Sequence, residues 1–127
     1  MLRILATAGR CAIPAFVAVV VLAMPAPAKA VGAFAIGKCG AYGEAYDYRA
    51  ANVARATALK QCKGACTALT MRRACAALAI DLKNPCGAHG YAVEPRISSS
   101  LNEATRKCYQ FGGKECVIRA WACDAKG

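Results

Sequence analysis

A seven-residue box that occurs twice limits the architecture of this chain more than any other feature. The first copy is Cys39-Gly40-Ala41-Tyr42-Gly43-Glu44-Ala45 and the second is Cys86-Gly87-Ala88-His89-Gly90-Tyr91-Ala92, at an offset of 47 residues. The similarity extends upstream, where Ala33-Phe34-Ala35-Ile36 corresponds to Ala77-Leu78-Ala79-Ile80. Self-similarity at a fixed spacing indicates one structural unit used twice. We place repeat one at about residues 31–80 and repeat two at about residues 77–127.

Residues 1–30 have the pattern of a cleaved secretory signal peptide. Arg3 and Arg10 provide the positive start, residues 12–24 are apolar, and Ala28-Lys29-Ala30 forms a small-x-small cleavage site. The apolar run is shorter than the roughly 20 residues of a spanning helix, so no transmembrane anchor is expected after cleavage. Residues 31–127 then form one small domain, which we expect to be periplasmic or secreted.

Cleavage would remove Cys11 and leave an even number of cysteines. In an exported chain, cysteines at repeating positions predict a disulfide framework. The eight are Cys39, Cys62, Cys66, Cys75, Cys86, Cys108, Cys116 and Cys123. About 105 pairings are possible for eight cysteines, and the repeat favours two bridges within each copy. The alternative, zinc binding by Cys62-x-x-x-Cys66, is disfavoured because Cys108 and Cys116 have a different spacing. We therefore expect no metal and no cofactor.

The hydrophobic pattern predicts strands and helices in the same order in both copies. Strands are expected at residues 31–36, 43–48, 67–71, 75–80, 91–93 and 116–121. One helix is predicted over residues 49–63, with a buried stripe of Ala51, Ala54, Ala58, Leu59 and Cys62. A second begins near residues 98–100, where Ser100 and Glu103 have capping-box spacing, and ends at Gly112-Gly113; its stripe is Ile97, Leu101, Ala104 and Cys108. The predicted fold is α+β: a small disulfide-rich domain of two tandem β-hairpin, helix, strand repeats sharing one core.

Several spaced elements also occur in a known family. They are Gly32-Ala33-Phe34-Ala35, the Gly-x-Ala strand at Gly43, the alanine-rich helix running into Leu59 and Cys62, the run Cys75-Ala76-Ala77-Leu78-Ala79, and the second Gly-x-Ala and helix-cysteine elements. With these the chain after residue 30 resembles the secreted bacterial domains of unknown function numbered 4189. Cys39, Cys86 and the polar second helix depart from the family pattern. The resemblance implies fold and export, and the family name carries no activity.

Aromatic and basic residues beside the two boxes are the candidate binding face. They are Tyr42, Tyr46, Tyr48, Arg49, Tyr91 and Arg96. Removing Arg3, Arg10 and Lys29 leaves 14 basic against 7 acidic residues, a net charge of +7 that favours an anionic envelope or glycan ligand, or an unknown protein. Because basic residues never run longer than two, no dedicated nucleic-acid binding is expected. The alternative is that the rings fill an alanine-rich core.

Catalysis is not predicted, and no catalytic residue is assigned. His89 is the only histidine, and its counterpart in the first box is Tyr42, which favours a structural ring over the base of a hydrolase. The acid pairs Glu44 with Asp47 and Glu94 with Glu103 are more typical of solvated surface than of a glycosidase. We therefore predict an exported, non-catalytic binding module of the bacterial envelope or extracellular space. The alternatives are a small secreted inhibitor or effector of another protein and, least favoured, an envelope hydrolase.

Overall fold

The computed structural model describes residues 14–15, 18 and 30–124, so the predicted leader lies almost entirely outside the described residues. No helix in these ranges is long and apolar enough to cross a membrane. The elements are β1 (Val31–Ile36), the 3-10 helix η1 (Lys38–Gly40), β2 (Tyr42–Tyr48), α1 (Ala51–Gln61), β3 (Thr67–Met71), β4 (Cys75–Asp81), β5 (His89–Glu94), α2 (Ile97–Gln110) and β6 (Cys116–Cys123). The predicted α+β class is confirmed.

Each half of the domain forms its own antiparallel sheet, with its first strand in the centre. The strand orders are β2-β1-β3 and β5-β4-β6, so the two sheets have the same topology. We call residues 31–71 the first unit and residues 75–123 the second unit. The two predicted repeats overlap at residues 77–80, which belong to β4. In the structure, β4 lies wholly in the second sheet.

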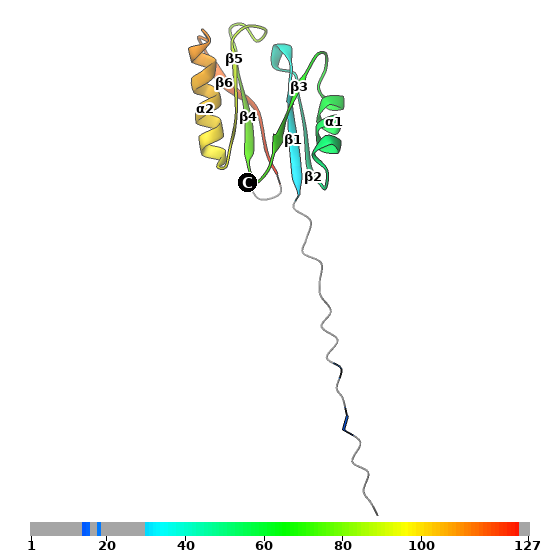
Figure 1. Cartoon of the computed structure of the whole chain (residues 1–127). Helices are drawn as coiled ribbons and strands as arrows, with labels where there is room; N and C mark the ends of the chain where they lie inside the picture. The colour runs from blue at the N-terminus through cyan, green and yellow to red at the C-terminus, as the bar shows by residue number, and fades with distance from the viewer. Residues whose placement is uncertain (1–13, 16–17, 19–29, 125–127) are drawn as a thin grey trace, which may run out of the picture.

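The elements stack in four layers, with α1 outside the first sheet and α2 outside the second (Figure 1). Successive side chains of a strand point to opposite faces, and the central strands follow this rule. In β1, Ala33 and Ala35 face α1 whereas Phe34 faces the other sheet. In β4, Ala77 faces α2 whereas Leu78 faces the first sheet. Both central strands are therefore buried on both faces.

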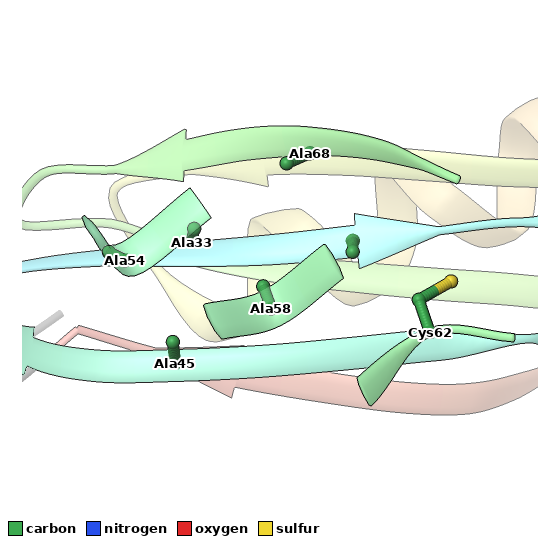
Figure 2. Close-up of a cluster of buried hydrophobic side chains, with 7 residues drawn as sticks. Ala33, Ala45, Ala54, Ala58, Cys62 and Ala68 are labelled. Carbon is green, nitrogen blue, oxygen red and sulfur yellow. The ribbon is translucent and has the colours of Figure 1, made fainter. Parts of the chain in front are cut away.

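The large apolar side chains lie between the sheets, and the helices rest on small ones. The central cluster contains Phe34, Ile36, Met71, Ala76, Leu78, Ile80 and Ala122. The cluster under α1, shown in Figure 2, contains Ala33, Ala35, Ala45, Ala54, Ala58, Cys62 and Ala68. The cluster under α2 contains Ala77, Ala79, Ala92, Ala104, Cys108 and Cys116. The central cluster draws on both units, so they share one core.

One glycine in each box sets the distance between helix and sheet. A Cβ on Gly43 would overlap the Ala58 carbonyl oxygen of α1. A Cβ on Gly90 would overlap the Ala104 carbonyl oxygen and the Cys108 nitrogen of α2. In both units the helix backbone lies directly on the strand backbone, which only glycine permits.

The eight cysteines of the described domain form four disulfides. Cys62–Cys66 and Cys108–Cys116 each join a helix end to the following strand. Cys39–Cys86 joins the two boxes and thereby the two units, and Cys75–Cys123 joins the first and third strands of the second sheet. The prediction of two bridges within each copy is wrong. Cys75 begins β4, so the first unit holds three of these cysteines and the second holds five.

Two predicted details of the helices also differ. Ser100 does not cap α2, which begins three residues earlier; its buried hydroxyl donates to the Cys75 carbonyl at 2.6 Å and accepts from the Glu94 N–H at 3.1 Å. Ser100 thereby satisfies two backbone groups at the ends of strands. Leu59 is 38% exposed, because α1 lies flat on small residues and buries only a narrow stripe containing Ala54 and Ala58.

Replacing Gly90 with larger residues is expected to destabilise the fold in proportion to size. Gly90→Ala should lower the free energy of unfolding by about 1–3 kcal/mol through overpacking, and Gly90→Leu by more. Gly64 is the control, because a Cβ there meets no atom within 4 Å although its φ is +86°. Gly64→Ala and Gly64→Leu should each cost about 1 kcal/mol for the backbone conformation alone. Guanidinium denaturation measures both series, and equal size dependence at the two glycines would contradict this packing.

Removing the bridge between the units is expected to cost more than removing a bridge within one. Cys39 and Cys86 are separated by 47 residues, whereas Cys62 and Cys66 are separated by 4. Chain entropy then predicts losses of about 4 kcal/mol for Cys39→Ala/Cys86→Ala and about 2 kcal/mol for Cys62→Ala/Cys66→Ala. Unfolding free energies of the two double variants test this difference. The reverse order would show that the short bridge contributes chiefly through core packing.

Candidate functional site

The six residues predicted as a binding face do not come together in the structure. One group lies on or directly after β2 and the other on β5 and just before α2: Tyr42, Tyr46, Tyr48 and Arg49 in the first, Tyr91 and Arg96 in the second. β2 is an edge of the first sheet and lies against β6, whereas β5 is the opposite edge of the second sheet. The two groups therefore occupy different edges of the molecule.

Two of the β2 tyrosines pack inward. The Tyr42 ring stacks on Phe34 with 6.2 Å between centroids, and the Arg119 guanidinium lies 5.2 Å from the centre of the Tyr42 ring. Tyr48 packs against the alanine cluster under α1. Tyr46 is 47% exposed, and the neighbouring Glu44 charge and hydrogen bond raise its pKa above the ordinary value. Tyr42 thus packs on the large side chains of the central cluster, and Tyr48 packs on the alanine cluster, as the alternative of core-filling rings expects.

The second box borders an open hollow. Its volume is about 420 Å³, and its lining consists of Gly87, Ala88, His89, Tyr91 and Phe111. Phe111 is 71% exposed and Tyr91 39% exposed. His89 is exposed as well, with its Nδ1 atom 3.3 Å from the Gly87 carbonyl oxygen. Three rings thus surround one surface depression at the edge of the second sheet.

Lys107 on α2 adds a positive charge beside this hollow. Its Nζ lies 6.0 Å from the centre of the Tyr91 ring and donates to the Tyr91 carbonyl at 3.4 Å. Because β5 is an edge strand, that bond covers a backbone acceptor that another strand could otherwise use. In the first unit, the Gln61 side chain accepts from the Glu44 N–H of edge strand β2 at 3.1 Å. In both units a side chain of the helix thus bonds to the backbone of the edge strand, but only in the second unit is that side chain charged.

Two insertions distinguish the second unit from the first. Cys108 and Cys116 are 8 residues apart whereas Cys62 and Cys66 are 4 apart, so the segment between the paired cysteines, which includes the last turn of α2, is four residues longer. The stretch from Ile80 to Cys86 is also three residues longer than that from Ile36 to Cys39. These longer segments carry large apolar side chains with exposed fractions of 52%, 50% and 71%: Leu82 after β4, Tyr109 in the last turn of α2 and Phe111 just after α2.

Asp81 holds the two insertions together. Its Oδ1 atom accepts from the Lys83 and Glu115 N–H groups, both at 3.1 Å, and Leu82 N–H donates to the Glu115 carbonyl at 2.9 Å. Burial acts to raise the pKa of Asp81. The backbone donors of Lys83, Glu115 and Lys114 and the Lys83 charge outweigh burial and hold the pKa below its ordinary value. The ionised carboxylate is therefore the form that braces both connections.

The aromatic pattern of the boxes does not single out Phe111, Lys107 or Asp81. Phe111 carries a usable signal, since it lies in the extra residues between Cys108 and Cys116. Lys107 and Asp81 carry none, because their roles depend on which backbone groups lie beside them. Cys62 and Cys66, the candidate zinc pair, are bonded to each other. Within residues 30–124, no three His, Cys, Asp or Glu side chains gather as a metal site.

Comparison with known proteins gives one match. A family model described as Domain of unknown function (DUF4189) matches residues 31–123, which span both units. No curated protein and no solved structure matches the chain. The resemblance inferred from the sequence is confirmed, and the family description names no activity.

The Asp81 carboxylate is expected to make stability depend on pH below about 4. A depressed pKa contributes stability that is present above the ordinary pKa and is lost as the pH falls through the lower, folded value. Asp81→Asn keeps an oxygen acceptor but removes the charge. Its unfolding free energy should therefore lie below wild type at pH 7 and fall less steeply on acidification. Urea denaturation across this range tests the prediction, and parallel pH profiles would contradict it.

Proposed function

The chain belongs to the DUF4189 family, and we propose that it is an exported, non-catalytic binding module of the bacterial envelope or extracellular space. The observation that carries the proposal is the open hollow of the second unit, where Tyr91 and Phe111 are exposed beside Lys107. Its partner is a protein or an anionic envelope or glycan ligand.

Two features support export. Residues 1–30 combine a positive start, an apolar run and a small-x-small site, the order found in cleaved leaders. The domain that follows carries four disulfides, which form and persist in oxidising compartments such as the periplasm and the extracellular space. Both features favour a periplasmic or secreted protein.

The support for binding is that exposed rings stand on a rigid frame. Gly90 seats α2 directly on β5, and the Cys108–Cys116 bridge joins the end of α2 to β6. Because such a frame already orders the backbone that carries the rings, binding a partner need not order that backbone further. Aromatic residues are also over-represented among those that dominate binding energy. The basic character of the chain favours an anionic partner.

The support for a non-catalytic role comes from the groups that would have to react. All eight cysteines of the domain lie in disulfides, so a thiolate nucleophile would first require reduction. The ring of His89 has the Gly87 carbonyl as its hydrogen-bond partner, whereas the base of a hydrolase is oriented by a carboxylate.

The test is co-sedimentation of the exported protein with a bacterial envelope fraction. Intact mass before and after reduction first establishes loss of residues 1–30 and the presence of four bridges. Wild-type protein is expected to sediment with the envelope, and Phe111→Ala should reduce the apparent affinity about tenfold, because truncated aromatic anchors cost at least this much. Moderate salt should release the protein from an anionic ligand.

Tyr46→Ala is the matched control, since it removes an exposed ring from the first unit, away from the hollow. Its binding should equal that of wild type. Equal losses in Phe111→Ala and Tyr46→Ala would remove the hollow from the proposal. Salt-resistant retention of one discrete protein would favour the alternative role as an inhibitor or effector.

A further inference from the structure

We propose that one end of the second unit docks on the surface of an anionic phospholipid bilayer. This inference rests on the proposed binding function and names its partner. The docking surface, which we call the tip, consists of Leu82 and Lys83 between β4 and β5 and of Phe111 and Lys114 between α2 and β6. Figure 1 shows both connections at the same end of the domain, opposite the end where β1 begins.

The tip is one braced surface rather than two separate loops. Asp81 accepts from the Lys83 N–H in one connection and from the Glu115 N–H in the other, both at 3.1 Å. The backbone bond from Leu82 to Glu115, at 2.9 Å, joins the same two segments. The apolar and basic side chains of the tip are thus carried on a fixed frame, so docking orders little additional chain.

The apolar members of the tip are large and open to water. Leu82 is 52% exposed and Phe111 is 71% exposed. Both lie on turns beyond the ends of strands and helices, at the extremity of the domain. Side chains in such positions can enter the boundary between headgroups and acyl chains without a complementary pocket on the partner. A glycan would stack on Phe111, but it offers no comparable contact for the aliphatic Leu82.

The charges around the tip complement an anionic surface. Lys83 and Lys114 are exposed beside Leu82 and Phe111, and Glu115 is the exposed acid among them. Asp81 is 5% exposed and its carboxylate is occupied by backbone donors, so it offers little negative charge to a partner. Lysines near a bilayer attract anionic headgroups. A second copy of this basic chain would instead be repelled.

The first unit shows that folding does not require these side chains. Its corresponding connections are Gly37-Lys38 and Lys63-Gly64-Ala65, which are short and carry no large apolar residue. The same hairpin, helix and strand form without them. Leu82 and Phe111 therefore stand on inserted segments, exposed to water, where an external partner accounts for them and the fold does not.

Co-sedimentation with defined vesicles tests the tip. Wild-type protein is expected to bind vesicles of phosphatidylglycerol and phosphatidylethanolamine but not vesicles of phosphatidylcholine. The bound protein should dissociate as salt is added. Leu82→Ser/Phe111→Ser should lower the partition coefficient about tenfold or more by removing both apolar contacts. Lys83→Gln/Lys114→Gln should lower binding to anionic vesicles about tenfold.

Matched variants in the first unit provide the controls. Tyr46→Ser removes an exposed ring from β2, and Arg55→Gln/Lys60→Gln removes two exposed charges from α1. Both should bind like wild type, and every variant should keep the wild-type unfolding midpoint because the substituted side chains are exposed. Losses in the controls as large as those in the tip variants would overturn the proposal, since net charge or hydrophobicity alone would then govern binding.

Fluorescence gives a second, local readout. Leu82→Trp is expected to shift its emission to shorter wavelength with anionic vesicles, as its ring leaves water. The native Trp121 lies five residues beyond Cys116 along β6, about 17 Å away at 3.3 Å per residue, and should not respond. A shift in wild-type protein, which has Trp121 as its single tryptophan, with no further shift in Leu82→Trp would place the bilayer elsewhere on the molecule and overturn the proposal.

The experiments distinguish an error in the bilayer proposal from an error in the proposed binding function. If wild-type protein ignores anionic vesicles but still binds the envelope fraction through Phe111, the bilayer is not the partner and the binding function stands. In that case the partner is a protein or a glycan. If the protein binds neither the vesicles nor the envelope fraction, both the binding function of the hollow and the docking of the tip are overturned.

Discussion

The close approach of each helix to its sheet is the constraint on which the rest of the structure depends. A four-layer domain has three interfaces to fill, and residues 31–123 supply few large apolar side chains for them. Gly43 and Gly90 let the helices touch the strands, so alanine and cysteine make up the buried clusters of the two outer interfaces. The large side chains are then concentrated between the sheets. Alanine buries little apolar area, so the outer layers gain little stability from packing. The disulfide at the C-terminal end of each helix adds stability there.

The same packing places one helical side chain over the open edge of each sheet. Gln61 covers a donor on β2, and Lys107 covers an acceptor on β5. Both bonds occupy backbone groups that would otherwise be free to pair with another strand. The choice of lysine in the second unit has a further effect, because the ammonium group also lies over the Tyr91 ring. A helix side chain therefore covers the edge strand in both units, and only in the second unit does that side chain also lie beside the hollow.

The elements were predictable because their signals are local. Alternation along β1 and β4 and the glycines after each helix gave the strands and helices to within a few residues. The bridges were not predictable, since pairing depends on which strands become neighbours, and Cys75 turned out to begin the second sheet. The two groups of residues in the candidate binding face lie apart for a similar reason. Equivalent positions in the two boxes lie on β2 and β5, which the stacking of the sheets puts at different edges.

In a fold with two units of the same topology, features that both units share are explained by folding, and features of one unit need another cause. Tyr42 and His89 illustrate the difference, since they hold equivalent places in β2 and β5. Tyr42 stacks on Phe34, whereas His89 is exposed and lines the hollow. The lining around His89 includes Phe111, which lies in the longer segment between Cys108 and Cys116, and Asp81 joins that segment to the one after β4. The framework common to both units therefore accounts for the fold, and the departure from it at Leu82 and Phe111 is the feature on which the proposed docking surface rests.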